Sequence, residues 1–421
     1  MNETPPLETW QIIDLLSHLV DKSLVVYEED KEGLGRYRLL ETVRQYGADR
    51  LRESGERDAL LRRHCGRFLE WAEAADERLA GPEQAAALDD LEAEHDNLRS
   101  ALDGCCCRGG DTETGLRLAA NLSEFWATRG HLSEGQQWLA LALAQCQDAG
   151  SEPGERSPTT KREWTARARA LHGAGRLAWH RGEYSVARQH FEEGLQLCRT
   201  QEDRQRITYL LMWLGNVAYH QADYEAARSL HGEALDLARE RGDPQGVGYA
   251  LMWLGNTACR RGEYAPAAAL YQESLATGRE IGDLQSVAYC LGNLGRLSCI
   301  QGDFEAARAP LRESLQIRHS LGDRPGIVIS LENFANLAAG QKRARRAARL
   351  MGATGALREA LGIPVPPIGR DEHNGYVARV RAALEEETFT AAWASGRALS
   401  RDQAVAYALS EEEENEENPD Q

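Results

Sequence analysis

The chain has 421 residues and a formal net charge of −17, which comes from 66 acidic and 49 basic side chains. This acidic balance argues against a broad nucleic-acid-binding surface. There is no run of about 18 apolar residues and no basic-then-apolar leader, so we expect a cytoplasmic chain with no membrane partner. The nine cysteines include no CxxC pair, and we expect neither a metal nor a cofactor.

The first 55 residues have a pattern unlike the rest of the chain. Trp10–Val20 has helical periodicity, the β-rich runs Ser23–Glu28 and Arg36–Leu40 flank a glycine-containing turn, and Glu41–Glu53 is again helical. A helix, a hairpin and a helix in this order form the second half of a winged-helix unit. We therefore predict a partial winged-helix segment over residues 1–55.

Two runs in this segment resemble one family: Leu15–Val25, Leu-Leu-Ser-His-Leu-Val-Asp-Lys-Ser-Leu-Val, and Arg36–Tyr46, Arg-Tyr-Arg-Leu-Leu-Glu-Thr-Val-Arg-Gln-Tyr. They look like the winged-helix module after the nucleotide-binding core of bacterial STAND ATPases, a group that includes many LuxR-type transcriptional regulators. The resemblance continues through Leu91–Arg99. The family's phosphate-binding loop, GxxxxGK[ST], is missing from this sequence. The resemblance therefore implies an ATPase core that acts either in cis, as part of a longer chain, or in trans.

DNA binding through this segment is the alternative that its fold suggests. In the family that it resembles, the module mostly packs against the ATPase core. The basic side chains here are mixed with acidic ones: Arg36, Arg38, Arg44 and Arg50 with Glu28, Glu29, Glu32 and Glu41. We therefore expect nucleic-acid binding by this chain alone to be unlikely.

Residues 56–110 read as a helical linker, with helices over 56–103 that are split at Gly81-Pro82. Residues 112–147 read as a first, degenerate copy of the repeat that follows. Asp148 to Lys161 is rich in glycine, proline and serine, which predicts a loop.

One sequence pattern then occurs four times, at intervals of 40 residues. It opens at Gly175, Gly215, Gly255 and Gly295, and an alanine follows twelve positions later at Ala187, Ala227, Ala267 and Ala307. Between them lies a turn such as Arg181-Gly-Glu-Tyr184. A fixed period of this size indicates stacked helical hairpins, because a single hairpin cannot bury its apolar face alone.

The pattern of glycine, alanine, a large residue and a small residue resembles the tetratricopeptide repeat. The resemblance implies an all-α fold, a right-handed superhelical solenoid over residues 111–362, preceded by the partial winged helix. Two copies depart from the family pattern, with His231 and Leu311 at the aromatic position, and we expect looser packing there.

After the array, residues 363–409 read as a C-terminal helical cap, and residues 410–421 as a disordered acidic tail. Ile363–Pro367 breaks the chain before the cap. The basic run Lys342–Arg349 is interpreted as a solvated helix face.

The sequence gives no sign of catalysis. It has neither HExxH nor GxSxG, and its paired carboxylates, such as Glu192-Glu193, fall on helices rich in charge. We expect a protein that is not an enzyme.

The candidate partner-binding residues lie on the first helices of the repeats. In a tetratricopeptide array these positions face the concave groove, where an asparagine amide suits a peptide backbone and arginine suits a carboxylate. Tyrosines would form an apolar floor between them. The alternative is that the asparagines bridge neighbouring helices. The predicted set is Arg176, Tyr209, Asn216, Tyr249, Asn256, Asn293, Arg296, Asn333 and Asn336.

The sequence therefore predicts an interaction scaffold and sensor of a bacterial signalling or transcription regulator, with a protein or peptide partner in the groove. The first alternative is a small-molecule inducer sensor, which a compact aromatic pocket near Trp179, Trp213 and Tyr219 would favour. The second is a DNA-bound regulator that uses the winged-helix segment.

Overall fold

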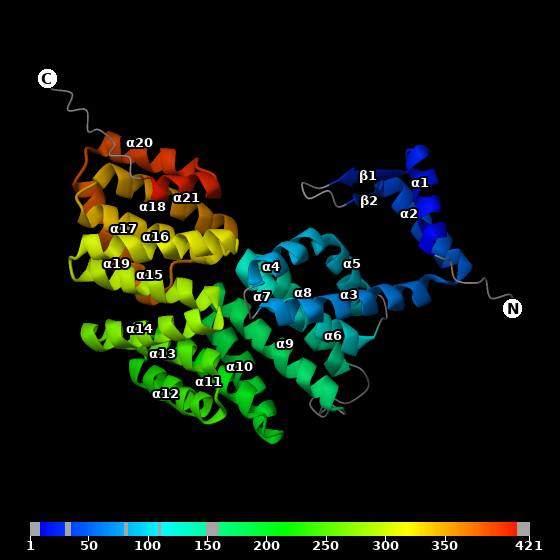
Figure 1. Cartoon of the computed structure of the whole chain (residues 1–421), viewed down its shortest axis with the longest axis horizontal. Coiled ribbons are helices and arrows are strands. Elements are labelled where there is room, and N and C mark those ends of the chain that lie inside the picture. Colours follow the sequence, from blue (N-terminus) through cyan, green and yellow to red (C-terminus); the bar gives the residue numbers. More distant parts are fainter. Residues whose placement is uncertain (1–8, 30–34, 80–82, 108–110, 149–159, 411–421) are drawn as a thin grey trace. The chain divides into compact units, whose positions relative to one another are not determined.

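The computed structural model describes residues 9–29, 35–79, 83–107, 111–148 and 160–410 (Figure 1). Two compact units make up the chain, Met1–His64 and Cys65–Gln421. Most of the predicted loop 148–161 and all of the predicted acidic tail beyond Ser410 lie outside the described residues.

The first unit contains the predicted helix, hairpin and helix: α1 (Thr9–Asp21), β1 (Val25–Glu29), β2 (Gly35–Leu39) and α2 (Glu41–Ser54). The two strands pair antiparallel, with Val25 opposite Leu39. Val25 is buried and anchors the hairpin. The sequence prediction for this segment is confirmed.

The linker begins with α3 (Arg57–Leu79), which runs from the first unit into the second, and continues with α4 (Gln84–Ala93) and α5 (His95–Cys106). The sequence predicted one helix where α4 and α5 stand, and the structure interrupts it at Glu94. Leu88, Leu91 and Leu98 are buried, as their helical spacing predicts.

The degenerate first repeat has a broken first helix. It consists of α6 (Thr112–Asn121), α7 (Ser123–Arg129) and α8 (Leu132–Asp148). Gly130 ends α7 with a φ of +77°, a conformation that glycine adopts without steric cost.

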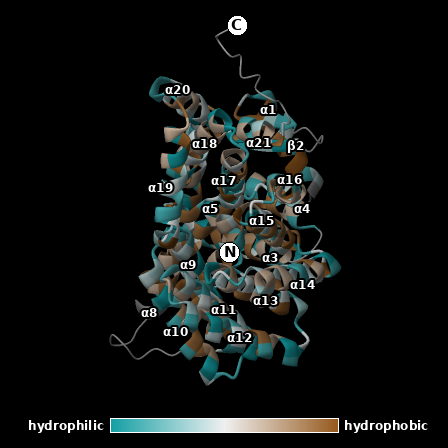
Figure 2. Ribbon diagram, turned by 90° about the vertical axis from the view of Figure 1, so that its left-hand side faces the viewer, coloured by the Kyte–Doolittle hydropathy of each residue, from teal (hydrophilic) through white to brown (hydrophobic). Residues whose placement is uncertain are grey.

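The regular array follows as consecutive antiparallel hairpins. Its helices are α9 (Lys161–His180), α10 (Tyr184–Thr200), α11 (Arg204–His220), α12 (Tyr224–Arg241), α13 (Pro244–Arg260), α14 (Tyr264–Ile281), α15 (Leu284–Ile300), α16 (Phe304–Ser320), α17 (Arg324–Gly340) and α18 (Ala344–Leu361). The chain therefore continues the repeat through a fifth hairpin, α17–α18. Within each helix hydrophobic residues alternate with hydrophilic ones (Figure 2), because one face packs on its neighbours.

Aspartate residues cap the N-terminal ends of first helices in the array. Asp243 accepts a hydrogen bond from the backbone N–H of Gly246 at 2.9 Å, and Asp323 from that of Gly326 at 2.8 Å. Each aspartate caps a helix start, where backbone N–H groups have no partner within the helix.

The second hairpin is tightly packed, which corrects the expectation of looser packing at His231. A methyl group on Gly215 would lie 2.5 Å from His231 Nε2, so the two helices can approach only because residue 215 is a glycine. His231 is fully buried and stacks on Trp253, with ring centroids 5.9 Å apart. Leu311, the second departure from the family pattern, is also buried.

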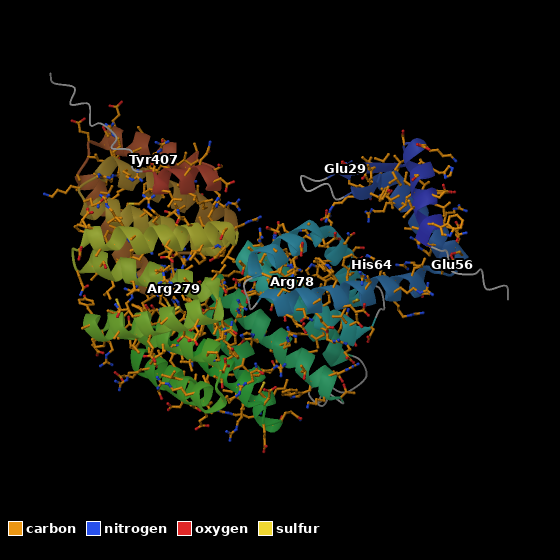
Figure 3. All side chains as sticks on the ribbon, viewed as in Figure 1. Glu29, Glu56, His64, Arg78, Arg279 and Tyr407 are labelled. Atoms are coloured by element: carbon orange, nitrogen blue, oxygen red, sulfur yellow. The ribbon has the colours of Figure 1, made fainter. Side chains whose placement is uncertain are left out.

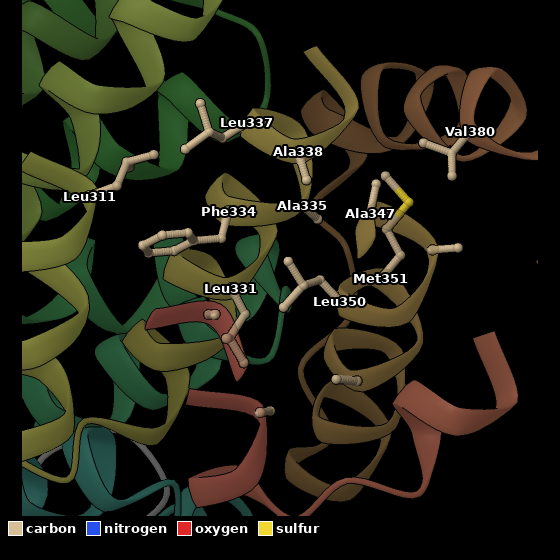
Figure 4. Close-up of a cluster of buried hydrophobic side chains, with 14 of the residues drawn as sticks. Leu311, Leu331, Phe334, Ala335, Leu337, Ala338, Ala347, Leu350, Met351 and Val380 are labelled. Carbon is tan, nitrogen blue, oxygen red and sulfur yellow. The ribbon is translucent and has the colours of Figure 1, made fainter. Parts of the chain in front are cut away.

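The cap consists of α19 (Pro367–Ala382), α20 (Glu386–Arg397) and α21 (Arg401–Leu409). Figure 4 shows its core, where Leu331, Leu350 and Met351 pack with Val380. α20 packs on α18, whereas α19 makes few contacts with other helices.

The basic run at the start of α18 is only in part the solvated face that the sequence suggested, because Lys342 and Arg345 are exposed whereas Arg346 is buried. Arg346 is 9% exposed and donates to the backbone carbonyl oxygens of Tyr407, Ala408 and Ser410 at 2.7 to 3.0 Å. Its guanidinium lies 4.7 Å from the Tyr407 ring centroid, and that of Arg349 lies 4.4 Å away; Tyr407 is labelled in Figure 3. The positive charge at the carbonyl end of α21 fixes the cap on the array.

The beginning and the end of the second unit also touch each other. α7 packs against α17, and Arg324 lies 3.4 Å from Glu92 of α4, 232 positions earlier. A methyl group on Gly130 would lie 2.7 Å from Leu361 at the end of α18. These contacts enclose the concave face of the array within this unit. None of the helices in the described ranges combines the length and apolar character that crossing a bilayer requires.

Candidate functional site

The concave face surrounds a cavity of about 280 Å³. The first helices of the repeats, α9, α11, α13, α15 and α17, line it on one side. Residues 363–369 and the first turns of α19 line it on the other side. The cavity is therefore an internal space between the repeat array and the chain's own C-terminal region.

Five of the predicted partner-binding residues line this cavity. Asn256 Oδ1 accepts hydrogen bonds from Tyr271 Oη at 2.8 Å and from Asn293 Nδ2 at 3.0 Å, which joins α13 to α15. The full set is Asn256, Asn293, Arg296, Asn333 and Asn336. These amides come from successive repeats, so they form one polar row across the array.

The other four predicted residues lie in the packing between helices and are not among the residues that line the cavity. Asn216 is fully buried, donates to Tyr249 Oη at 2.8 Å and lies 2.9 Å from His231 Nε2. Tyr209 contacts Gln245 at 3.4 Å. Arg176 is bonded to Glu124 of α7, and its guanidinium lies 5.3 Å from the Trp213 ring centroid.

An aromatic wall stands beside the amide row; it includes Trp179 and Tyr219 of the aromatic pocket considered in the sequence analysis, but not Trp213. Trp179 lies at the centre of the cluster, with ring centroids 4.9 Å from His220 and 5.9 Å from Trp253. Trp179, Tyr219, His220 and Trp253 all line the cavity. Spacing in the sequence points to part of this lining. His180, His220 and Arg260 follow Arg176, Asn216 and Asn256 by four residues, about one helical turn.

Burial keeps the histidines of this wall neutral. Desolvation, followed by the charge of a nearby arginine, lowers the pKa of His180 and of His220 to about 3. His172 lies edge-on to Trp213, and desolvation is also the main cause that lowers its pKa to about 3. At neutral pH the wall therefore contributes neutral rings, and the positive charge in the cavity comes from arginine.

Four arginines line the cavity: Arg260, Arg296, Arg318 and Arg358. Arg318 is buried and donates to the backbone carbonyl oxygen of Gly326. Arg260 Nη1 pairs with Glu372 of α19 at 2.8 Å, and its Nε donates to Tyr219 Oη at 3.2 Å. Arg358 pairs with Glu332 at 2.8 Å. No ion pair joins Arg296 to a carboxylate in the described part of the chain, and its Nη2 donates to Cys259 Sγ at 3.8 Å. Arg296 can therefore hold a carboxylate that the chain does not supply.

A second polar cluster lies away from the cavity. Glu92, His95 and His131 place their potential ligand atoms within 4.8 Å of one another. Glu92 is bonded to His131 at 3.2 Å and to Arg324 at 3.4 Å, and Glu134 lies 3.2 Å from His95 Nε2 and 2.6 Å from Arg99. Two arginines already balance the two carboxylates, so this network joins α4, α5, α8 and α17 as an ion-pair cluster.

Comparison with known proteins agrees with the repeat and the hairpin units. The family described as tetratricopeptide repeat matches residues 206–280 and 247–320, and the family described as winged helix-turn-helix domain matches residues 6–52. The chain therefore carries tetratricopeptide repeats and an N-terminal winged helix-turn-helix domain.

Some of the curated relatives are regulators by name, and others are uncharacterised. A Mycobacterium tuberculosis protein that carries the name HTH-type transcriptional regulator is 40% identical over 137 residues, and a Mycobacterium bovis protein of the same description matches equally. The match covers 32% of this chain and only 15% of the relative's length. An uncharacterised M. tuberculosis protein is 47% identical over 57 residues, 14% of each chain.

Solved structures match this chain at low sequence identity. NprR in complex with its cognate peptide NprX has a TM-score of 0.50 and 14% identity, and the match covers 79% of this chain and 89% of that one. A Rap protein complexed with competence and sporulation factor has a TM-score of 0.46 and 11% identity over 80% of this chain and 99% of that one.

Proposed function

We propose that the repeat unit is the sensor and scaffold of a bacterial transcription or signalling regulator, and that it binds a segment of a partner protein on its concave face. The observation that carries the proposal is the cavity itself, where a row of amides and the unpaired Arg296 come from successive repeats. An amide side chain offers both a donor and an acceptor to a peptide unit, and a guanidinium holds a carboxylate with two parallel hydrogen bonds. NprR, which shares this fold, binds a peptide.

The chain would act in this role without catalysis. Its acidic charge and the named regulators among its relatives support a signalling part, and the ATPase core implied by the STAND resemblance would lie in cis or in trans. Binding would then bias that partner module by stabilising one arrangement of the repeats over another.

A cross-linking experiment tests where the partner binds. A photoreactive amino acid at Ile329, a cavity-lining residue that is 38% exposed, should cross-link to a partner in cells. The matched control is Gln316 on the outward-facing helix α16, which is also exposed. Cross-links from position 329 and not from 316 support the proposal, and cross-links from 316 alone contradict it.

A small-molecule inducer is the second candidate, and the enclosed aromatic wall favours it. Trp179 and Tyr219 line a cavity that the chain's own segment partly covers, which suits a compact ligand better than an open trough does. A thermal-shift screen of metabolites against the wild-type chain and Arg296→Ala separates the two candidates. A metabolite that raises the melting temperature of the wild type but not of Arg296→Ala would favour this second function.

A further inference from the structure

The chain's own segment 363–376 lies on the concave face where a partner would bind. A methyl group on Gly182, in the turn before α10, would lie 3.0 Å from Pro364 Cγ. Ile368 packs on the cluster that contains Tyr219 and Trp253. Glu372 pairs with Arg260 of α13. The segment therefore reaches the first, second and third repeats while it connects α18 to the cap.

Two arginines close to this segment in the sequence hold its backbone. Arg358, at the end of α18, donates to the carbonyl oxygen of Pro364 at 3.2 Å, and Arg370 donates to that of Val365 at 3.2 Å. Its contacts with Tyr219, Trp253 and Arg260 are made by the side chains of Ile368 and Glu372. Pro364 and Pro367 are exposed, and Ile363, Val365 and Ile368 are only half-buried.

The two ends of α19 are attached very differently. Val380, near its C-terminal end, is 2% exposed and belongs to the core of the cap. Near its N-terminal end, Glu372 pairs with Arg260 at 2.8 Å, and His373 Nδ1 lies 3.9 Å from a carboxylate oxygen of Glu332. The extended residues and the first turns of α19 can therefore leave the cavity while the cap stays folded on α18.

We propose that the surface beneath residues 363–373 is the partner-docking surface, and that its partner is a segment of the same chemistry: branched apolar residues beside paired prolines, followed by a carboxylate. The chain's own segment occupies this surface until such a partner displaces it. Prolines suit this role because an extended proline-rich segment loses little conformational entropy on binding. The partner's carboxylate replaces Glu372 in the ion pair with Arg260. Arg296 can then bind a second acidic group of the partner.

The proposal rests on the proposed function of the concave face, and it adds a competition that can be measured. An internal segment acts at an effective concentration in the millimolar range, so an outside copy of it should bind the wild-type chain poorly. Any change that weakens the Arg260–Glu372 pair should let the outside copy bind better.

The test titrates a fluorescent peptide that copies Gly362–Tyr376 into the full chain. Glu372→Arg places a second guanidinium against Arg260, and the peptide should bind this variant at least about tenfold more tightly than the wild type, since a charged hydrogen bond is worth about one such factor. The swap Arg260→Glu with Glu372→Arg restores the pair and should return binding to the wild-type level. Asp371→Arg, the same charge change one residue earlier at an exposed position, should behave as the wild type does.

If Glu372→Arg does not fold, Glu372→Gln weakens the pair with Arg260 without adding a second positive charge. The peptide should also bind this variant more tightly than it binds the wild type. Equal affinity of the peptide for the folded wild type and the folded opened variant would overturn the competition. So would the absence of peptide binding to every variant. Neither result bears on cross-linking at Ile329, so failure of this inference is distinct from failure of the proposed function.

Discussion

Asn216 on α11 and His231 on α12 lie in hydrogen-bonding contact, with Oδ1 and Nε2 2.9 Å apart and both side chains fully buried. Asn216 also donates to Tyr249 on α13 at 2.8 Å. One amide therefore connects three helices. This is the bridging role that the sequence left open as the alternative to partner binding.

Replacing Asn216 with alanine should lower the stability of the repeat unit. The change leaves the His231 ring nitrogen and the Tyr249 hydroxyl without this partner, which should cost about 1–3 kcal/mol in the free energy of unfolding. Urea denaturation followed by circular dichroism measures it. Asn336→Ala is the matched control, because Asn336 is less buried and lines the cavity, and it should cost clearly less. Equal losses in the two variants would contradict the assignment of Asn216.

Because α11 and α12 of the second hairpin pack closely, a larger side chain between them should lower the stability of the chain. Ala227 is fully buried between α11 and α12, and Ala227→Trp should destabilise the chain by about 1–3 kcal/mol or more through overpacking. Ser229→Trp, on the exposed face of the same helix, should change the melting temperature little. An unchanged melting curve for Ala227→Trp would speak against the helix pairing.

The buried histidines predict a loss of stability on mild acidification. Their pKa values in the folded chain are about 3 for His172, His180 and His220 and about 4 for His231, below the unfolded value of about 6.5. The unfolded chain therefore binds more protons below pH 6.5, so stability is full above that pH and falls as the pH drops towards the folded values. Each histidine contributes about 2 kcal/mol to the loss between pH 7 and pH 5. Urea midpoints that do not move between these two pH values would contradict the burial of these rings.

The winged-helix unit predicts weak or absent DNA binding by this chain alone. Its arginines already pair with carboxylates of the same unit: Arg38 with Glu28 at 3.1 Å, Arg44 with Glu41 at 2.8 Å and Arg52 with Asp49 at 2.9 Å. Phosphate contacts would have to break these pairs while the chain carries 17 net negative charges. A mobility-shift assay at near-physiological salt should show no complex that survives excess competitor DNA, and a specific complex would favour the DNA-bound alternative.

The helical hairpins could be predicted from the period of 40 residues, because the pattern of glycine, alanine and a turn is local and repeats in register. The same pattern selected five residues that line the cavity in the structure: Asn256, Asn293, Arg296, Asn333 and Asn336. It failed to separate Asn216 from Asn256, since the difference depends on how deeply each amide is buried among its neighbours. Asn216 is fully buried, whereas Asn256 keeps 8% exposure at the cavity.

The covering of the concave face could not be predicted from the sequence. The run Ile363–Pro367 indicates a break in a helix and says nothing about where the chain goes next. Its position depends on contacts between residues far apart, such as Arg260 with Glu372, 112 positions later. Such pairing leaves no periodic trace in a single sequence.

The most direct test is the affinity of the partner recovered by cross-linking at Ile329 for the wild-type chain and for Arg296→Ala. Loss of a charged hydrogen bond should weaken binding about tenfold or more, because Arg296 lines the cavity and forms no ion pair with a carboxylate in the described part of the chain. Gln316→Ala, on the outward-facing helix α16, should bind as the wild type does. Equal affinity of the wild type and a correctly folded Arg296→Ala would contradict partner recognition in the cavity.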